Sequence, residues 1–158
     1  EYIINKALEI CDKVLVFIGS SDKFGTIENP FSYELRKKLI KKIYENEIVE
    51  NKLVISPLAD LGAGNVTKWG DYLFCEAEKI LGKVDCIVYG KESKCKSWFS
   101  EKIKKSVNFI VISRDDIKIN ASTLRNYMKE NDFERWRKFV NEKNWSEFEK
   151  MREILIKI

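Results

Sequence analysis

The chain has 158 residues, of which 44% are hydrophobic and 34% are charged, and only two are prolines. This composition predicts one folded globular domain and excludes a disordered or fibrous chain. A net charge of +4 is too small for a nucleic-acid-binding surface, and the absence of histidine excludes Ser/His/Asp hydrolysis and histidine metal sites. No stretch approaches the ~20 apolar residues of a membrane span, and no signal segment is visible. We therefore expect a cytoplasmic protein that binds neither membranes nor nucleic acids.

The four cysteines, Cys11, Cys75, Cys86 and Cys95, do not follow the C-x-x-C spacing of zinc sites. They also do not form the dense framework of a small secreted domain. We interpret them as reduced hydrophobic residues and predict no metal site.

The first third of the chain reads as helix, strand and helix. Apolar residues at helical spacing predict a helix over residues 1–12, and a β-branched run predicts a strand over residues 13–19. A polar loop follows. Asn29 and Pro30 then predict a helix start, because Asn accepts hydrogen bonds from free N–H groups and Pro lacks a donor where none is needed.

The rest of the chain repeats this alternation of apolar strands and amphipathic helices. Residues 58–70 have no regular period, which predicts a binding loop. Asn120 is typical of an N-cap, for a helix that runs through Met128, and the helical residues 133–158 are predicted to break near Asn144. We expect further strands over residues 53–56, 85–90 and 108–113, and further helices over residues 71–81 and 94–105.

Strands that alternate with helices predict an α/β fold with a Rossmann-like parallel sheet. Four strands are visible, with helices on both faces and helices at the C-terminus, and a fifth strand is expected upstream of Glu1. The first visible strand ends in Gly19 and Ser20. Small residues at the carboxyl end of a parallel strand leave backbone N–H groups free to approach a phosphate or a sugar. The sequence therefore predicts a nucleotide site at this turn.

Four motifs follow one another along nearly the whole chain. They are Gly19-Ser20-Ser21-Asp22, then Asn29-Pro30-Phe31 with Arg36 five residues beyond the Phe, then Asp60 ahead of Trp69 and the strand end Tyr89-Gly90, and finally Ile119-Asn120-Ala121-Ser122-Thr123-Leu124-Arg125.

This order resembles the nucleotidyltransferases of the H-x-G-H superfamily, and among them the archaeal-type nicotinamide-nucleotide adenylyltransferases. The last motif matches the family's I-S-A-T-x-I-R at Ala121 and Arg125. Two departures stand out within the motifs: Asp22 occupies a family Gln position, and Glu34-Leu35 stands where the family has Gly-Glu. The H-x-G-H motif itself is expected just upstream of Glu1. The resemblance thus implies a single nucleotidyltransferase domain over 1–158 that lacks its first strand and the start of its first helix.

The resemblance implies adenylyl transfer from ATP, which enters with Mg²⁺, to nicotinamide mononucleotide, with NAD and pyrophosphate as products. It gives Arg125 the catalytic role of gripping the β- and γ-phosphates, Trp69 a stacking role on nicotinamide, and Arg36 a contact to the mononucleotide phosphate. The implied ATP-binding residues are Gly90, Glu92, Ser122, Thr123 and Arg125, and the implied mononucleotide-binding residues are Gly19, Ser20, Asn29, Arg36, Asp60 and Trp69.

Each of these residues also has a structural interpretation. Arg125 and Arg36 can be solvated arginines on helix surfaces, Trp69 can be a core residue at a helix start, and Gly90 can be part of a plain strand-end turn. The alternative functions are a cytidylyltransferase, an adenylyltransferase for another phosphorylated acceptor, and a nucleotide-binding module without activity. A homo-oligomer stays open, because the C-terminal aromatic residues can pack within the chain or on a second copy.

Overall fold

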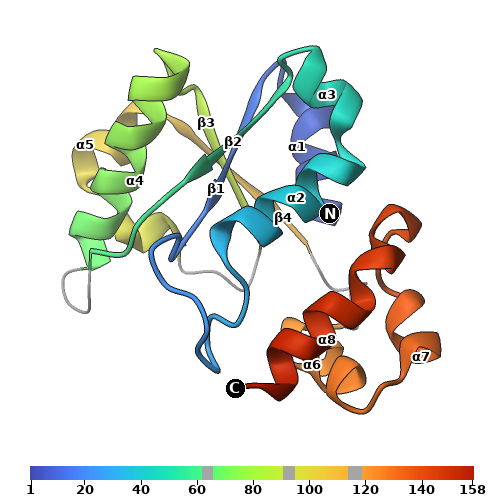
Figure 1. Cartoon of the computed structure of the whole chain (residues 1–158). Coiled ribbons are helices and arrows are strands. Elements are labelled where there is room, and N and C mark those ends of the chain that lie inside the picture. The colour runs from blue at the N-terminus through green and yellow to red at the C-terminus, as the bar shows by residue number, and fades with distance from the viewer. Residues whose placement is uncertain (62–65, 91–94, 114–118) are drawn as a thin grey trace. The chain divides into compact units, whose positions relative to one another are not determined.

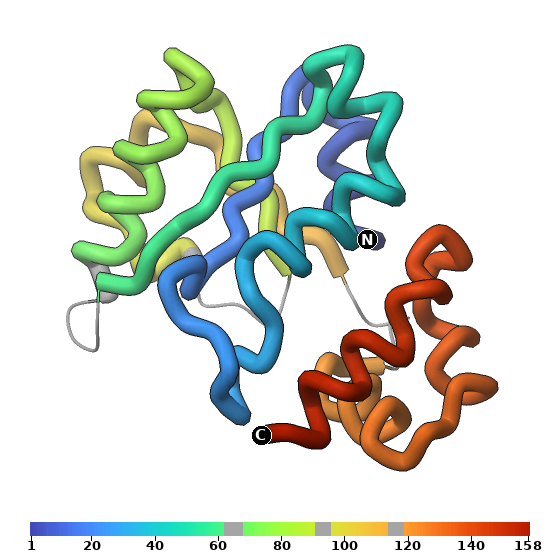
Figure 2. The backbone as a smooth tube through the Cα atoms, viewed as in Figure 1, coloured from blue at the N-terminus to red at the C-terminus, as the bar shows by residue number. Residues whose placement is uncertain are grey.

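The computed structural model describes residues 1–61, 66–90, 95–113 and 119–158 (Figure 1), and the course of the backbone can be followed in Figure 2. None of the described helices has the combined length and apolarity needed to cross a bilayer. The elements in chain order are α1 (Tyr2–Ile10), β1 (Val14–Ile18), α2 (Tyr33–Ile43), α3 (Glu45–Val49), β2 (Leu53–Pro57), α4 (Val66–Leu81), β3 (Cys86–Gly90), the 3-10 helix η1 (Cys95–Trp98), α5 (Glu101–Ser106), β4 (Asn108–Ile112), α6 (Ala121–Lys129), α7 (Phe133–Arg137), the 3-10 helix η2 (Glu142–Glu147) and α8 (Phe148–Ile156).

All four predicted strands form, and they pair in parallel. β3 and β4 run side by side in a register that places Cys86 opposite Asn108. In the other pair, the Val14 N–H donates to the Lys52 carbonyl at 2.8 Å, so that β1 and β2 start side by side. The prediction of a mixed α/β fold with parallel strands and C-terminal helices is therefore confirmed.

The described strands form two sheets of two, β1-β2 and β3-β4, rather than one sheet of four. Apolar runs predict where strands occur, but they carry little information on which strands become neighbours. The fifth strand, expected upstream of Glu1, stays a prediction.

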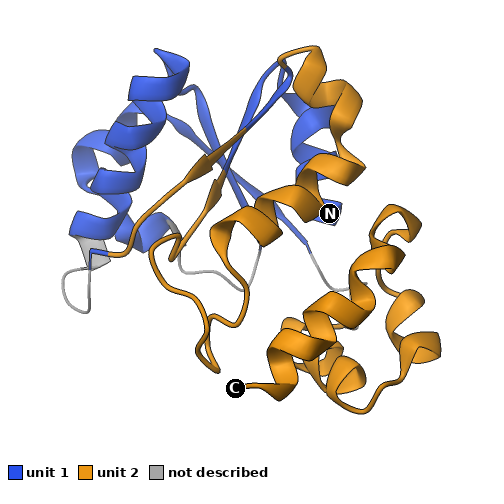
Figure 3. Cartoon of the chain, in the orientation of Figure 1, with its two compact units in different colours: residues 1–16, 52–54, 61–116 blue, residues 17–51, 55–60, 117–158 orange. Residues whose placement is uncertain are grey.

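The chain folds into two compact units, and neither is continuous in sequence (Figure 3). Unit 1 comprises residues 1–16, 52–54 and 61–116, and unit 2 comprises residues 17–51, 55–60 and 117–158. The strands β1 and β2 contribute to both units. The interpretation of the chain as a single domain stays a prediction.

The core of unit 1 lies between the β3-β4 sheet and the helices α4 and α5. Phe74, Phe99 and Ile103 are buried there, and Ile87 and Phe109 of the strands pack against them. Helix α1 packs on β3 as well. Helices α1 and α5 thus each contact a strand of this sheet. Helices on both faces of one sheet stay a prediction.

Gly70 allows α4 and η1 to approach closely within unit 1. A Cβ atom at this position would lie 2.1 Å from the Trp98 carbonyl oxygen, far inside van der Waals contact. The glycine is therefore required by packing and does not mark the end of a loop.

The core of unit 2 joins α2 to the C-terminal helices. Trp136 is 1% exposed, and its ring centroid lies 5.1 Å from that of Phe148, in an edge-on arrangement. Leu35 of α2 packs into the same cluster together with Met128, Met151 and Leu155. The C-terminal aromatic residues are thus largely used within the chain.

Helix α2 begins later than the sequence predicts. Its N-cap is Ser32, whose Oγ accepts a hydrogen bond from the Leu35 N–H at 3.3 Å. The predicted cap, Asn29, lies in the preceding loop, where its backbone N–H donates to the Thr26 hydroxyl at 3.0 Å. Asn and Ser have similar capping preferences, so local chemistry did not decide between them.

Helix α4 begins earlier than predicted, at Val66 rather than at residue 71. The prediction of a binding loop over residues 58–70 is wrong for its last five residues, which include Trp69. Gly70 lies inside this helix, where close packing against Trp98 requires a glycine. Residues 62–65 lie outside the described part of the chain.

Two other predicted helices are divided. Residues 94–105 contain η1 and α5, separated near Ser100, whose N–H donates to the Asp71 carboxylate at 2.8 Å. The region of residues 133–158 forms α7, η2 and α8, so it has three pieces rather than two, and Asn144 lies inside η2. Amphipathic spacing predicts a buried face but does not detect such short interruptions.

A buried carboxylate ties η2 to α2. Glu147 is 5% exposed, and its Oε1 lies 2.6 Å from the Lys38 ammonium and 2.5 Å from the Lys42 ammonium. Hydrogen bonds from Lys38 and then Lys42 stabilise the charged form and hold the pKa of Glu147 below its usual value. The ion pairs of Glu147 with the two lysines therefore make the stability of unit 2 depend on pH.

We expect Glu147→Gln to lower the free energy of unfolding at neutral pH by about 2 kcal/mol, because it replaces charge-assisted hydrogen bonds with weaker ones. The pKa of Glu147 is lower in the folded state than in the unfolded state. Its contribution is therefore complete above the unfolded pKa of ~4.3 and disappears as pH falls through the folded pKa. Denaturant unfolding at neutral and acidic pH measures both effects.

The matched control is Glu149→Gln, because Glu149 is 67% exposed and pairs with Arg152 at 3.7 Å. It is expected to change stability by less than about 0.5 kcal/mol. If both variants lose stability equally, or if Glu147→Gln keeps the full acid dependence of the parent protein, the buried pair does not have this role.

Candidate functional site

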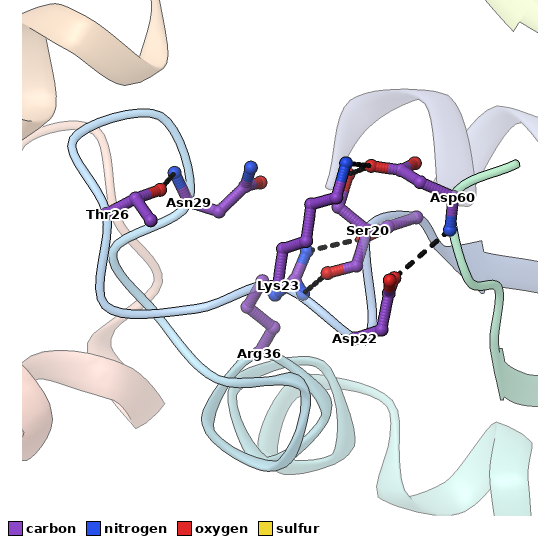
Figure 4. Close-up of polar contacts among 8 residues, drawn as sticks. Ser20, Asp22, Lys23, Thr26, Asn29, Arg36 and Asp60 are labelled. Atoms are coloured by element: carbon purple, nitrogen blue, oxygen red, sulfur yellow. Dashed lines mark hydrogen bonds and ion pairs between the residues drawn. The ribbon is translucent and has the colours of Figure 1, made fainter. Parts of the chain in front are cut away.

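The turn after β1 has an unusual backbone, and α2 holds it in place (Figure 4). Ser20 has a positive φ of 48°, a conformation that non-glycine residues rarely adopt. The Arg36 guanidinium donates from Nη1 to the Gly19 carbonyl at 2.7 Å and from Nη2 to the Ser20 carbonyl at 2.9 Å. Arg36 therefore positions the turn directly, and two of its three nitrogens are used for this.

A second set of contacts joins the turn to the segment that follows β2. The Ser20 hydroxyl donates to Asp60 Oδ2 at 2.9 Å, and the Lys23 ammonium lies 2.9 Å from the same oxygen. The Asp60 N–H in turn donates to Asp22 Oδ1 at 3.1 Å. The carboxyl ends of parallel strands meet at one sheet edge, which explains why residues 40 positions apart come together.

These contacts set the charge of the cluster. The hydrogen bond from Lys23, followed by that from Ser20, lowers the pKa of Asp60. The same pair raises the pKa of Lys23. Asp60 therefore carries a negative charge at neutral pH, and Lys23, whose side chain is 49% exposed, can still turn toward an anionic ligand.

The N-terminus of α6 forms as predicted. Asn120 Oδ1 accepts hydrogen bonds from the Thr123 N–H at 2.9 Å and from the Thr123 hydroxyl at 3.1 Å. Arg125 Nη2 donates to the Ser122 hydroxyl at 3.2 Å. Asn120 is confirmed as the N-cap, Ser122 and Arg125 lie together, and the Thr123 hydroxyl is used by the cap.

A cavity of about 400 Å³ lies within unit 2 and brings together residues from the two halves of the predicted site. Asn29 and Arg36 belong to the predicted mononucleotide half of the site, and Arg125 of α6 belongs to the predicted ATP half. Its size falls in the usual range for small-molecule sites, and most of its wall is apolar. The apolar part of the wall includes Pro30, Phe31, Leu39, Leu124, Met128 and Trp136.

Two polar atoms in residues that line this cavity are buried and have no hydrogen-bond partner among the described residues. They are Nε of Arg36, a donor, and Oδ1 of Asn144, an acceptor. Asn144 is held in place because its Nδ2 donates to the Leu39 carbonyl at 3.1 Å. Buried polar atoms are nearly always paired, so these two atoms are exceptions, and neither is open to solvent in this structure.

The other predicted site residues fall outside this group. Trp69 is half-buried in α4, where its ring tilts against that of Tyr72 at 5.8 Å between centroids. Gly90 is buried as the last residue of β3. Both belong to unit 1, whereas the turn, the Asp60 cluster and the cavity belong to unit 2. Glu92 lies outside the described residues.

Sequence reasoning missed Lys23 and Asn144 as site residues, and it treated Asp22 only as a departure from a family pattern. Asp22 and Lys23 could have been proposed, because they lie within four residues of Gly19 in the predicted turn. Nothing local singles out Asn144. The sequence predicts only a helix break near it, and its position depends on the Leu39 carbonyl 105 residues away.

Comparison with models of known protein families finds none that matches the chain, and comparison with curated proteins gives no significant match. The assignment of a function therefore rests on the sequence motifs and on the geometry of the described residues.

Proposed function

We propose that this protein is a nucleotidyltransferase that transfers the adenylyl group of ATP to nicotinamide mononucleotide. The observation that carries the proposal is the cavity in unit 2, whose lining includes Asn29, Arg36 and Arg125. These residues come from motifs some 90 positions apart, and the resemblance gives both arginines a contact to a phosphate group. Apolar walls beside guanidinium groups suit a ligand that has a flat base and an anionic phosphate.

The reaction needs alignment and charge neutralisation rather than a protein nucleophile. A phosphate oxygen of the mononucleotide attacks the α-phosphorus of ATP, and the bond to the β-phosphate oxygen breaks. The products are a dinucleotide and pyrophosphate. Negative charge builds up on the leaving pyrophosphate, so cationic side chains and the Mg²⁺ that accompanies ATP are the main requirements.

Arg125 has the catalytic role in this proposal. It follows the capped N-terminus of α6, where free N–H groups and the positive end of the helix favour anions. Its guanidinium has one donor on Ser122 and others that remain for the β- and γ-phosphates of ATP. Ser122 then orients Arg125 and, together with Thr123, borders the phosphates.

Arg36 and Asp60 have positioning roles. Because Arg36 donates to the Gly19 and Ser20 carbonyls, it fixes the turn that would meet the mononucleotide. Asp60 holds the Ser20 hydroxyl and the Lys23 ammonium. In this arrangement Lys23, rather than Arg36, is the mobile cation for the mononucleotide phosphate. Trp69, Gly90 and Glu92 stay predictions for the nicotinamide and adenosine contacts.

The test is an acceptor screen with the protein made from its complete coding sequence. ATP or CTP is combined with nicotinamide mononucleotide or with phosphopantetheine, and pyrophosphate and the joined product are measured. We expect both only from ATP with nicotinamide mononucleotide in the presence of Mg²⁺. Turnover of CTP would indicate a cytidylyltransferase, and turnover of phosphopantetheine would indicate another acceptor. If no pair releases pyrophosphate while ATP still binds, the protein is a nucleotide-binding module and the proposal is wrong.

A further inference from the structure

Two cysteine thiols, distant in sequence, meet inside unit 1. Cys11 Sγ and Cys86 Sγ lie 3.4 Å apart, although the residues are 75 positions apart in the chain. A disulfide bond needs a sulfur–sulfur distance of ~2.0 Å, so the sulfurs must approach each other by roughly 1.4 Å. Both residues are partly exposed to solvent.

Regular structure holds both ends of this pair. Cys11 is the C-cap of α1, where its N–H donates to the Ala7 carbonyl at 2.9 Å. Cys86 is the first residue of β3 and pairs with Asn108 of β4. Because α1 packs on β3, the two sulfurs are kept near one another in the reduced protein.

We infer that Cys11 and Cys86 are a modification site, at which a low-molecular-weight disulfide oxidises the pair to a reversible intramolecular disulfide. In the first step the Cys86 thiolate attacks one sulfur of the reagent, whose other half leaves as a thiolate. In the second step the Cys11 thiolate attacks the Cys86 sulfur of the mixed disulfide and releases the second thiol. The pair loses two protons and two electrons, and the reagent is reduced to two thiols.

The Cys11 thiol of the reduced protein is largely protonated near neutral pH. Burial, followed by the contact with Cys86, raises the pKa of the Cys11 thiol to about 11. Since only the thiolate attacks, the reaction is expected to become faster as the pH rises toward that pKa. This inference is independent of the proposed enzymatic function, because it uses no residue of the candidate site.

The experiment uses the double variant Cys75→Ser/Cys95→Ser, in which Cys11 and Cys86 are the remaining cysteines. The variant is treated with oxidised glutathione at mildly alkaline pH. We expect the intact mass to fall by two hydrogen atoms with no glutathione retained. The midpoint of thermal unfolding is expected to rise by about 10 °C, because the bond closes a long loop, and to return after reduction. The reduced form of the same variant is the reference, so a folding defect cannot imitate the result.

Two outcomes would overturn the inference. One is a stable glutathione adduct on Cys11 or Cys86 in place of ring closure. The other is an unchanged mass under conditions in which the exposed Cys75 of the parent protein acquires glutathione. As a matched control, adding Cys11→Ser to the pair-only variant is expected to stop the reaction at the Cys86 adduct and abolish the thermal shift.

Discussion

Replacement of Arg125 by alanine is expected to lower kcat/KM for ATP by about 100- to 1,000-fold. The proposal gives its guanidinium the task of neutralising charge on the leaving pyrophosphate, and the loss of one such donor typically has an effect of this size. Arg125 is only half-buried and makes one described hydrogen bond, to Ser122, so stability is expected to change by less than about 1 kcal/mol. Steady-state kinetics with saturating mononucleotide, together with denaturant unfolding, measures both quantities.

The matched control is Lys129→Ala, because Lys129 is an exposed cation on the same helix, one turn beyond Arg125. It removes the same unit of charge and is expected to change kcat/KM by less than about threefold. An equal loss in both variants would mean that the net charge of α6, not Arg125, supports the reaction. Unchanged kinetics in Arg125→Ala would remove this residue from the site.

The largest effect on stability is expected from Trp136→Ala, at about 3 to 5 kcal/mol. The side chain is 1% exposed at the centre of the unit 2 core, and its removal leaves a cavity next to Phe133 and Phe148. Denaturant unfolding followed by circular dichroism gives the free energy of unfolding.

Phe139→Ala is the control for this variant. Phe139 lies close to the same cluster, with its ring 6.5 Å from that of Tyr127, but it is 46% exposed. We expect a loss of about 1 kcal/mol. If Trp136→Ala falls within 1 kcal/mol of the parent protein, the C-terminal helices do not share a core with α2.

Features that depend on near neighbours in sequence were predictable. Residues 14–18 form a strand, and Asn120 caps α6, because β-branched runs and N-caps act over a few residues. The starts of two helices, α2 and α4, were predicted wrongly. Ser32 caps α2 in place of Asn29, and α4 begins at Val66, ahead of the glycine that packs against Trp98.

The candidate site could be predicted only in part, because its contacts join residues that lie far apart in the sequence. Ser20 and Asp60 are predicted as site residues from two different motifs, and the structure joins them by a hydrogen bond. Arg36 was predicted to contact a phosphate, yet it donates to two carbonyls of the turn, which depends on the tertiary path of the chain. The unpaired Oδ1 of Asn144 depends on contacts across 105 residues, which no local pattern records.

The discontinuity of unit 2 has a consequence for how the protein is made. On the ribosome, the apolar face of α2 with Leu35 emerges early, whereas its partners lie in α6, α7 and α8, after residue 120. All of residues 61–116, which belong to unit 1, are synthesised in between. We therefore expect the nascent chain to expose this face for most of its synthesis, and unit 2 to complete its folding only when α8 has left the exit tunnel.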